Sequence, residues 1–206
     1  MMSGLMLVFL FIAIGFMIEV QSQKDAMRDV AALYRDTQAN LNEALYSEFE
    51  DDLAIWDATI TKDNSVIFNA PEVLFEPSSS QIQDHFKTIL DQFFPRLLTV
   101  LSSPQYKDEI LELTVEGHTS NTWANTTNLK DIYLNNMKLS QDRAYSVLSY
   151  CYSLDDENVK KNRAWLEKYF RANGMAYSKL KDKATARRVE FTIGLKSEDK
   201  IYEILE

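Results

Sequence analysis

The segment from Ile110 to Tyr150 contains a strand, a polar loop and a helix in immediate succession, and this order constrains the fold more than any other feature of the chain. Ile110–Val115 reads ILELTV, in which β-branched and leucine residues alternate with polar ones, so we predict a half-buried strand. Glu116–Ser120 follows, and Gly117 with its small polar neighbours favours a sharp turn. Residues 121–128 form a polar loop rich in Asn and Thr.

A helix is predicted after this loop, because apolar side chains recur near helical spacing at Leu139, Ala144, Val147 and Leu148. The strand end, the loop and the helix then converge, and we expect four polar residues to face a single ligand: Thr119, Ser120, Asn136 and Arg143. Each also has an ordinary structural role. Asn136 and Ser140 could cap the helix, Arg143 could be a solvated or capping arginine, and His118 could be a turn residue bonded to the backbone.

Several separated motifs resemble the OmpA-like peptidoglycan-binding domain. VEGHTS, ending at Ser120, and NMKLSQDRA, beginning at Asn136, are similar to that family's strand ending GHTD and its helix N-x-x-L-S-x-x-R-A. ARRVEF at 186–191 resembles its closing N-R-R-V-E-F strand, and VLF at 73–75 with Ser78–Ser80 resembles its L-F-x-x-G-S turn. These matches occur in the family's order across residues 57–195.

The resemblance implies a ligand and a set of binding residues. In that family the Asp of GHTD and the Arg of the helix clamp the diaminopimelate of the peptidoglycan stem peptide. Arg143 would be that Arg, and its planar fork suits a carboxylate. The predicted binding residues are Thr119, Ser120, Asn135, Asn136, Leu139, Arg143 and Arg187. Ser120 departs from the family's Asp, and a neutral hydroxyl cannot pair with the ligand's ammonium; Asn135 and Ala186 depart from the commoner Tyr and Asn.

Residues 1–18, MMSGLMLVFLFIAIGFMI, contain no charged residue. At helical rise, 18 residues span about 27 Å, close to the thickness of a bilayer's hydrocarbon core. A secretory signal peptide would have a basic start and a small-x-small cleavage site, and neither is present. We therefore predict a retained transmembrane helix over residues 1–20.

This apolar segment is similar to the single transmembrane helix of MotB-type stator subunits. In that family the helix follows an ion-carrying Asp, which in this register would lie just before Met1, so we expect the true start upstream and no ion-carrying residue in this chain. The resemblance implies a homodimer beside a MotA-like subunit in the bacterial inner membrane, crossing it once, with the C-terminal domain in the periplasm. A membrane-tethered peptidoglycan anchor without ion conduction is the alternative.

Within this class, three stretches resemble the ZorB subunits of Zorya anti-phage defence systems more than flagellar MotB. They are GLMLVFLFIAIGFM, VLFEPSSSQIQDHFKTILDQF and GHTS. The resemblance implies a ZorA-like partner and a role in antiviral defence, with the flagellar role as the alternative.

Residues 21–54 are polar and helix-forming, and they predict a helical linker. Met27, Tyr34 and Leu41 repeat every seven residues, which gives three imperfect heptads, the lower limit for a coiled coil. Two alternatives follow for this segment: a parallel coiled coil formed with a second copy of the chain, or a single amphipathic helix that packs on the domain.

The folded domain is predicted over residues 55–206, as an α+β fold of the α/β-sandwich kind with helices on one mixed sheet. The expected elements are a hairpin at 58–61 and 65–69, a helix at 81–100 that Pro95 bends or ends early, the strand and helix described above, a helix at 158–173 stopped by Asn173-Gly174, and a strand at 188–195.

Composition excludes several classes of function. The net charge is −9 without a basic run, which argues against direct binding of nucleic acid. One cysteine excludes an internal disulfide, and two histidines show no metal-site spacing. Because no nucleophile–base pair or phosphate loop is present, we predict no enzyme activity, no metal and no cofactor.

Overall fold

The computed structural model describes residues 2–69, 74–76, 78–179 and 187–196, with side chains from Met6 onward. The chain divides into two units, one of which contains the residues up to Thr37, while the other extends from Gln38 to Leu195. Residue 73 of the predicted turn and residue 186 of the closing motif lie outside the described residues.

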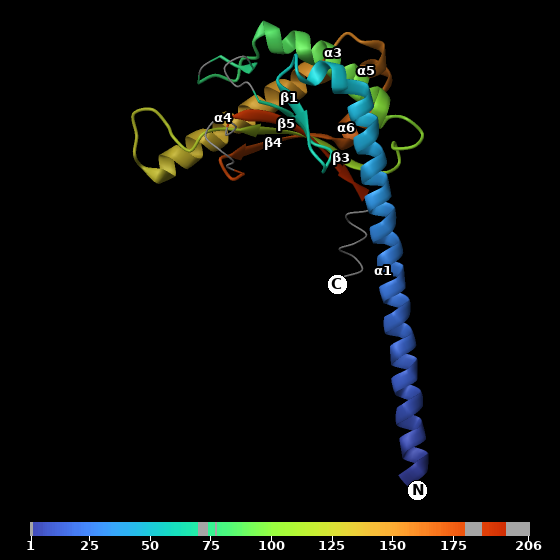
Figure 1. The fold of residues 1–206 in the computed structure, drawn as a ribbon. Coiled ribbons are helices and arrows are strands. Elements are labelled where there is room, and N and C mark those ends of the chain that lie inside the picture. The colour runs from blue at the N-terminus through green and yellow to red at the C-terminus, as the bar shows by residue number, and fades with distance from the viewer. Residues whose placement is uncertain (1, 70–73, 77, 180–186, 197–206) are drawn as a thin grey trace. The chain divides into compact units, whose positions relative to one another are not determined.

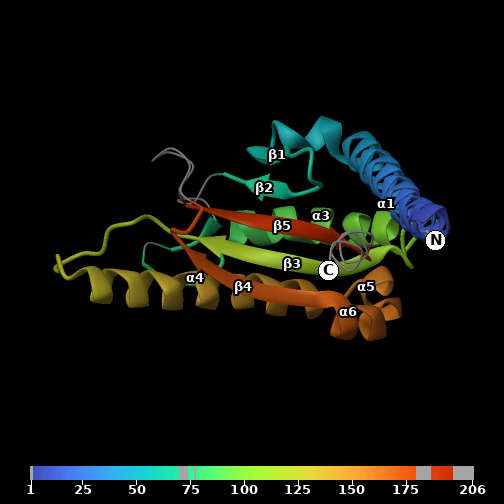
Figure 2. The ribbon, with the colours of Figure 1, turned by 90° about the horizontal axis from the view of Figure 1, so that it is seen from below.

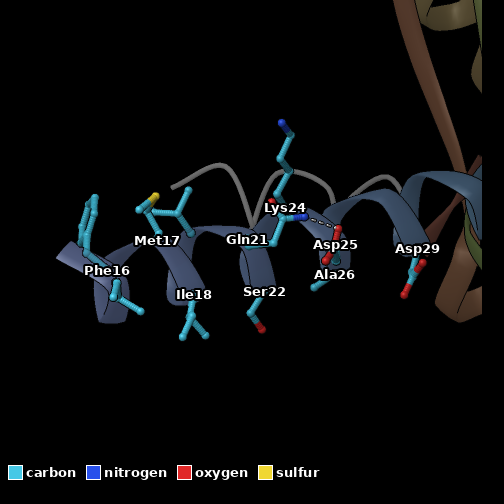
Figure 3. A pocket seen from close by; sticks show the side chains of 11 residues that line it. Phe16, Met17, Ile18, Gln21, Ser22, Lys24, Asp25, Ala26 and Asp29 are labelled. Atoms are coloured by element: carbon cyan, nitrogen blue, oxygen red, sulfur yellow. Dashed lines mark hydrogen bonds between the residues drawn. The ribbon is translucent and has the colours of Figure 1, made fainter. Parts of the chain in front are cut away.

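Helix α1, Met2–Leu53, is one continuous α-helix (Figure 1). Its apolar residues from Met6 to Val20 are exposed, and α1 contains the one candidate membrane span found among the described residues. Figure 3 shows the end of this apolar stretch, where Phe16, Met17 and Ile18 are followed by Gln21, Ser22, Lys24 and Asp25. The Gln21 side chain donates a 2.9 Å hydrogen bond to Asp25. This change from apolar to polar side chains fits the predicted transmembrane helix.

The last part of α1 belongs to the folded unit that begins at Gln38. Leu41, Leu45 and Phe49 are fully buried there, and the Asn42 amide donates a 2.7 Å hydrogen bond to the Thr61 carbonyl. Leu41, the third heptad position, therefore packs within the folded unit. The boundary between linker and domain, and the coiled coil itself, remain predictions.

A mixed five-stranded sheet, in the order β1-β2-β5-β3-β4, forms the centre of the folded unit (Figure 2). Its strands are β1 Ala58–Ile60, β2 Val66–Phe68, β3 Ile110–His118, β4 Phe170–Ala176 and β5 Arg188–Leu195. The β3–β4 pair is parallel and the other pairs are antiparallel. The predicted hairpin, central strand and closing strand are confirmed.

Helices α3, Asp84–Leu101, and α4, Leu129–Tyr152, cover the same face of the sheet. Phe191 of β5 packs against Phe93 of α3 with ring centroids 5.0 Å apart. Phe191 is paired with Val115 of β3, so Val115 and the alternate residue Gly117, which lies against α4, are on this face too. The expected arrangement of helices on one mixed sheet is confirmed.

Pro95 lies inside α3 and does not end it early, which excludes one of the two predicted effects of this proline and leaves the predicted bend untested. The helix continues to Leu101 because Leu97, Leu98 and Leu101 are fully buried against the core. The Pro95 carbonyl accepts a 2.7 Å hydrogen bond from Asn158, which also holds this part of the helix in place.

The predicted helix at 158–173 is interrupted at Asn162 and is wrong for its last four residues, which belong to a strand. Two short helices, α5 Glu157–Lys161 and α6 Arg163–Tyr169, are followed by strand β4. Phe170 begins that strand and stacks on Phe94 of α3, with ring centroids 5.2 Å apart. Gly174, predicted to stop a helix, lies within β4 instead, where its backbone pairs with β3 and packs against α4.

Candidate functional site

A pocket of about 260 Å³ lies at the end of β3, where the following loop meets the middle of α4. Figure 2 shows the loop from β3 returning to the start of α4 at this end of the sheet. Six of the seven predicted binding residues line the pocket: Thr119, Ser120, Asn136, Leu139, Arg143 and Arg187. The seventh, Asn135, is half-buried on α4 and is not among the lining residues.

Close packing of β3 against α4 sets the floor of the pocket. A Cβ atom on Gly117 would lie 2.2 Å from the backbone oxygen of Ser140, so only glycine permits this approach. Ser140 is fully buried and is not a cap, because its hydroxyl accepts a 3.0 Å hydrogen bond from the Ala176 N–H and donates one to the Met137 carbonyl. These contacts fix α4 against both β3 and β4.

The helix begins earlier than Asn136, since Asn128 is the N-cap and accepts a 3.0 Å hydrogen bond from the Lys130 N–H. Asn136 is buried instead, and its amide donates to the carbonyls of Ile132 at 2.9 Å and Thr122 at 3.2 Å. It therefore ties the loop to the helix at the pocket wall.

Arg143 is 7% exposed and is neither a solvated nor a capping arginine. Its Nε donates a 2.9 Å hydrogen bond to the Ser79 carbonyl, and its guanidinium carbon lies 4.8 Å from the ring centroid of Phe75. Burial, and then the positive charge of Arg187, lower the pKa of the Arg143 guanidinium from its usual value to about 10. Arg143 is therefore still charged at neutral pH.

Two residues with hydroxyl groups, Thr119 and Ser120, also line the pocket. Thr119 is 2% exposed, and its N–H donates a 2.8 Å hydrogen bond to the Ala176 carbonyl. Its Oγ1 is buried and has no hydrogen-bond partner among the described residues. The Ser120 hydroxyl lies 3.3 Å from that of Thr122. A cationic guanidinium with neutral hydroxyls beside it can bind a carboxylate.

A second polar cluster lies on the face of the sheet away from α3 and α4, and sequence reasoning missed it. His118 is 1% exposed within β3, so it is not the expected turn residue. Its Nε2 is 3.3 Å from a carboxylate oxygen of Glu116 and 3.7 Å from one of Glu190. The sequence does contain a signal for this cluster: Glu-x-His in β3 and Arg-x-Glu in β5 each place two charged or titratable side chains on the same face of a strand.

Cations already neutralise the two carboxylates of this cluster. Lys179 donates a 2.9 Å hydrogen bond to Glu116, and Arg188 donates to Glu190. Burial alone would raise the pKa of Glu116, but hydrogen bonds and charge from His118 and Lys179 hold that pKa below its usual value. The His118, Glu116 and Glu190 ligand atoms lie within 4.8 Å of one another. With both carboxylates paired to cations, the chemistry is that of an ion-pair network.

Solved structures with similar folds come from bacterial envelope proteins. The cell wall anchor of the type VI secretion system from Pseudomonas aeruginosa is 22% identical, with a TM-score of 0.49, over 74% of this chain and 97% of that one. The periplasmic domain of Helicobacter pylori MotB is 17% identical, with a TM-score of 0.46, over 72% of this chain and 95% of that one. No protein-family model matches the chain.

Fold and site together define an α+β domain with a polar pocket, in a chain with a candidate membrane helix. A much closer relative is the Zorya protein ZorB of Escherichia coli (Crooks strain), which is 39% identical over 214 residues, covering all of this chain and 89% of that protein. The chain therefore belongs to the ZorB family.

Proposed function

We propose that this protein is a stator-type anchor that binds peptidoglycan through the pocket around Arg143. The observation that carries the proposal is Arg143 itself, a charged and largely buried guanidinium held by Ser79 and Phe75 with no carboxylate partner among the described residues. A buried charge without a partner is costly, so such a residue is expected where a ligand supplies the missing charge. The ligand we propose is the diaminopimelate carboxylate of the stem peptide.

In this proposal α1 crosses the bacterial inner membrane once and the domain lies in the periplasm. The exposed apolar residues of α1 support a membrane span. Two copies of the chain would lie beside a MotA-like, or ZorA-like, membrane subunit, and the domain would hold that motor fixed to the wall. The protein would act by binding, without catalysis. Membership of the ZorB family supports a role in defence against phage.

Replacing Arg143 tests the anchoring function directly. We expect Arg143→Ala to weaken co-sedimentation of the detergent-solubilised full chain with purified sacculi by at least about tenfold, because the charge-assisted hydrogen bonds to the carboxylate are lost. Arg163→Ala is the matched control, since Arg163 is an exposed arginine on α6 and lies outside the pocket. Wild-type sedimentation of a folded Arg143→Ala protein would refute the proposal.

A plain wall anchor without a motor, in which α1 serves only as a membrane tether, is the second candidate. The two candidates differ in their membrane partner. Purification of the chain from its own host in mild detergent would recover a MotA-like subunit if the stator proposal is right. Recovery without such a subunit would support the plain anchor.

A further inference from the structure

The charged groups of the pocket all have the same sign. Arg143 and Arg187 line it, and no carboxylate is among the lining residues within the described part of the chain. The proximity of the two arginines is reflected in the lowered pKa of Arg143. This concentration of positive charge is notable in a chain whose net charge is −9. The described lining of the pocket therefore offers a ligand the positive charge of Arg143 and no carboxylate.

The Arg143 guanidinium has hydrogen-bond donors available for an acceptor on a ligand. Nη1 and Nη2 of Arg143 make no hydrogen bond to the described residues, because only Nε is used, by the Ser79 carbonyl. The Thr119 hydroxyl is a second unpaired group, buried in the wall of the same pocket. A carboxylate has two oxygens, and it can accept hydrogen bonds from both Nη1 and Nη2 of Arg143 at once.

The position that would decide whether an ammonium is bound is Ser120, which follows β3 and lines the pocket. A serine hydroxyl offers an ammonium a neutral hydrogen bond, which contributes much less than the charge-assisted bond of an aspartate. Two nearby guanidinium groups add a repulsive contribution to any ammonium in the pocket.

We infer that this pocket recognises a carboxylate whose neighbouring amine is acylated, so that its ligands include cross-linked stem peptides, in which that amine is part of an amide bond. The inference rests on the proposed function, because it takes the stem peptide as the ligand. Ser120 is then the specificity-determining residue. Its neutral side chain removes the preference for a free ammonium, while the Arg143 guanidinium holds the carboxylate.

The experiment compares two soluble ligands, which are stem tripeptides ending in diaminopimelate with the side-chain amine either free or acetylated. Calorimetry with the detergent-solubilised full chain should show that the acetylated peptide binds at least as tightly as the free one. In Ser120→Asp the preference should reverse, with the free amine favoured by about tenfold or more, because an ammonium–carboxylate pair is restored. Ser120→Asn separates charge from size at this position: because its side chain is neutral, it should not produce the preference for the free amine that Ser120→Asp produces.

The possible failures are distinguishable. A wild-type preference of tenfold or more for the free amine would overturn this inference and leave the proposed function intact, because peptide binding would remain. Equal ratios in wild type and Ser120→Asp would overturn the role of Ser120. Binding of neither peptide would refute the stem peptide as ligand, and the inference would be refuted with it.

Discussion

In the proposed function, the Arg143 side chain is already held in place before its ligand binds. Phe75 covers one face of its guanidinium and the Ser79 carbonyl fixes its Nε, so the group loses little further freedom on binding. Its burial disfavours the charged form, and Arg187 adds to this effect. A bound carboxylate would offset both contributions. The residue therefore lowers the stability of the free protein and favours the complex.

Binding to sacculi should weaken at alkaline pH. The pKa of Arg143 is lowered to about 10, so its charge is present at neutral pH and is lost as the pH rises through that value. Co-sedimentation should therefore persist to about pH 9 and decline above pH 10. The free energy of unfolding should change in the opposite direction. Above pH 10 the unfolded state binds more protons at Arg143 than the folded state does, so the unfavourable contribution of this residue to folding disappears as the pH rises. Circular dichroism at each pH serves as the control for folding.

Glu116 contributes to stability through its partners rather than to binding. Glu116→Gln removes a buried charge that accepts hydrogen bonds from Lys179, and it should lower the free energy of unfolding by about 1–3 kcal/mol. Because the pKa of Glu116 is lowered in the fold, this contribution is present at neutral pH and is lost as the pH falls through that pKa. Urea unfolding at pH 7 measures the difference. Glu112→Gln, at an exposed position of the same strand, should change little.

At the scale of elements, the contact between β3 and α4 creates the pocket. Gly117 and Ser140 bring the two backbones together, and Gln141 of α4 bonds the backbone of β4 through Ala172 at 3.1 Å and Gly174 at 2.7 Å. Strand β4 is thereby attached to the same helix that carries Asn136 and Arg143. The pocket geometry thus depends on three elements that are distant in sequence.

Gly117→Ala should disrupt this contact. The added methyl group would lie 2.2 Å from the Ser140 oxygen, a backbone atom that cannot move alone, so we expect a loss of about 2–4 kcal/mol of stability and weaker sacculus binding. Gly194→Ala in β5 is the matched control. Its new Cβ would meet the exposed Glu112 side chain at 3.3 Å, which can move aside, so thermal unfolding of that variant should be close to wild type.

At the scale of the whole molecule, a candidate membrane span and a folded unit occur in one chain, and α1 is unbroken from Met2 to Leu53. Of the heptad positions, Leu41 is already buried within the folded unit. Met27 and Tyr34 belong to the other unit and are the heptad positions at which a contact with a second copy of the chain is predicted.

A dimer formed through this helix should be detectable by cysteine cross-linking. Met27→Cys should give a disulfide-linked dimer in membranes, whereas Asp29→Cys, at a different heptad position, should give little. The native Cys151 should not interfere, because it is fully buried and its burial raises the pKa of the thiol well above the usual value. Equal cross-linking at both positions would contradict a parallel helical contact.

Local patterns alone predicted much of this protein. The uncharged stretch of residues 1–18, the alternation in Ile110–Val115 and the helical spacing in α3 each carry enough information within one element to define it. These elements share a cause, since hydrophobic period and turn chemistry act between residues that are close in sequence. The pocket residues were predicted differently: the resemblance to OmpA-like motifs implied seven binding residues, of which six line the pocket, and their binding role stays a prediction.

Other features depended on contacts between residues far apart in the chain. Residues 170–173 continue a helical pattern, yet they form a strand because β3 offers backbone partners and Phe94 offers Phe170 a stacking surface. Pro95 remains inside a helix because the buried leucines after it stabilise that helix. His118 became part of an ion-pair network only when β5 brought Glu190 beside it. In each case the sequence by itself determined the local preference, and tertiary packing decided the outcome because burial and backbone pairing contribute more free energy than local propensity.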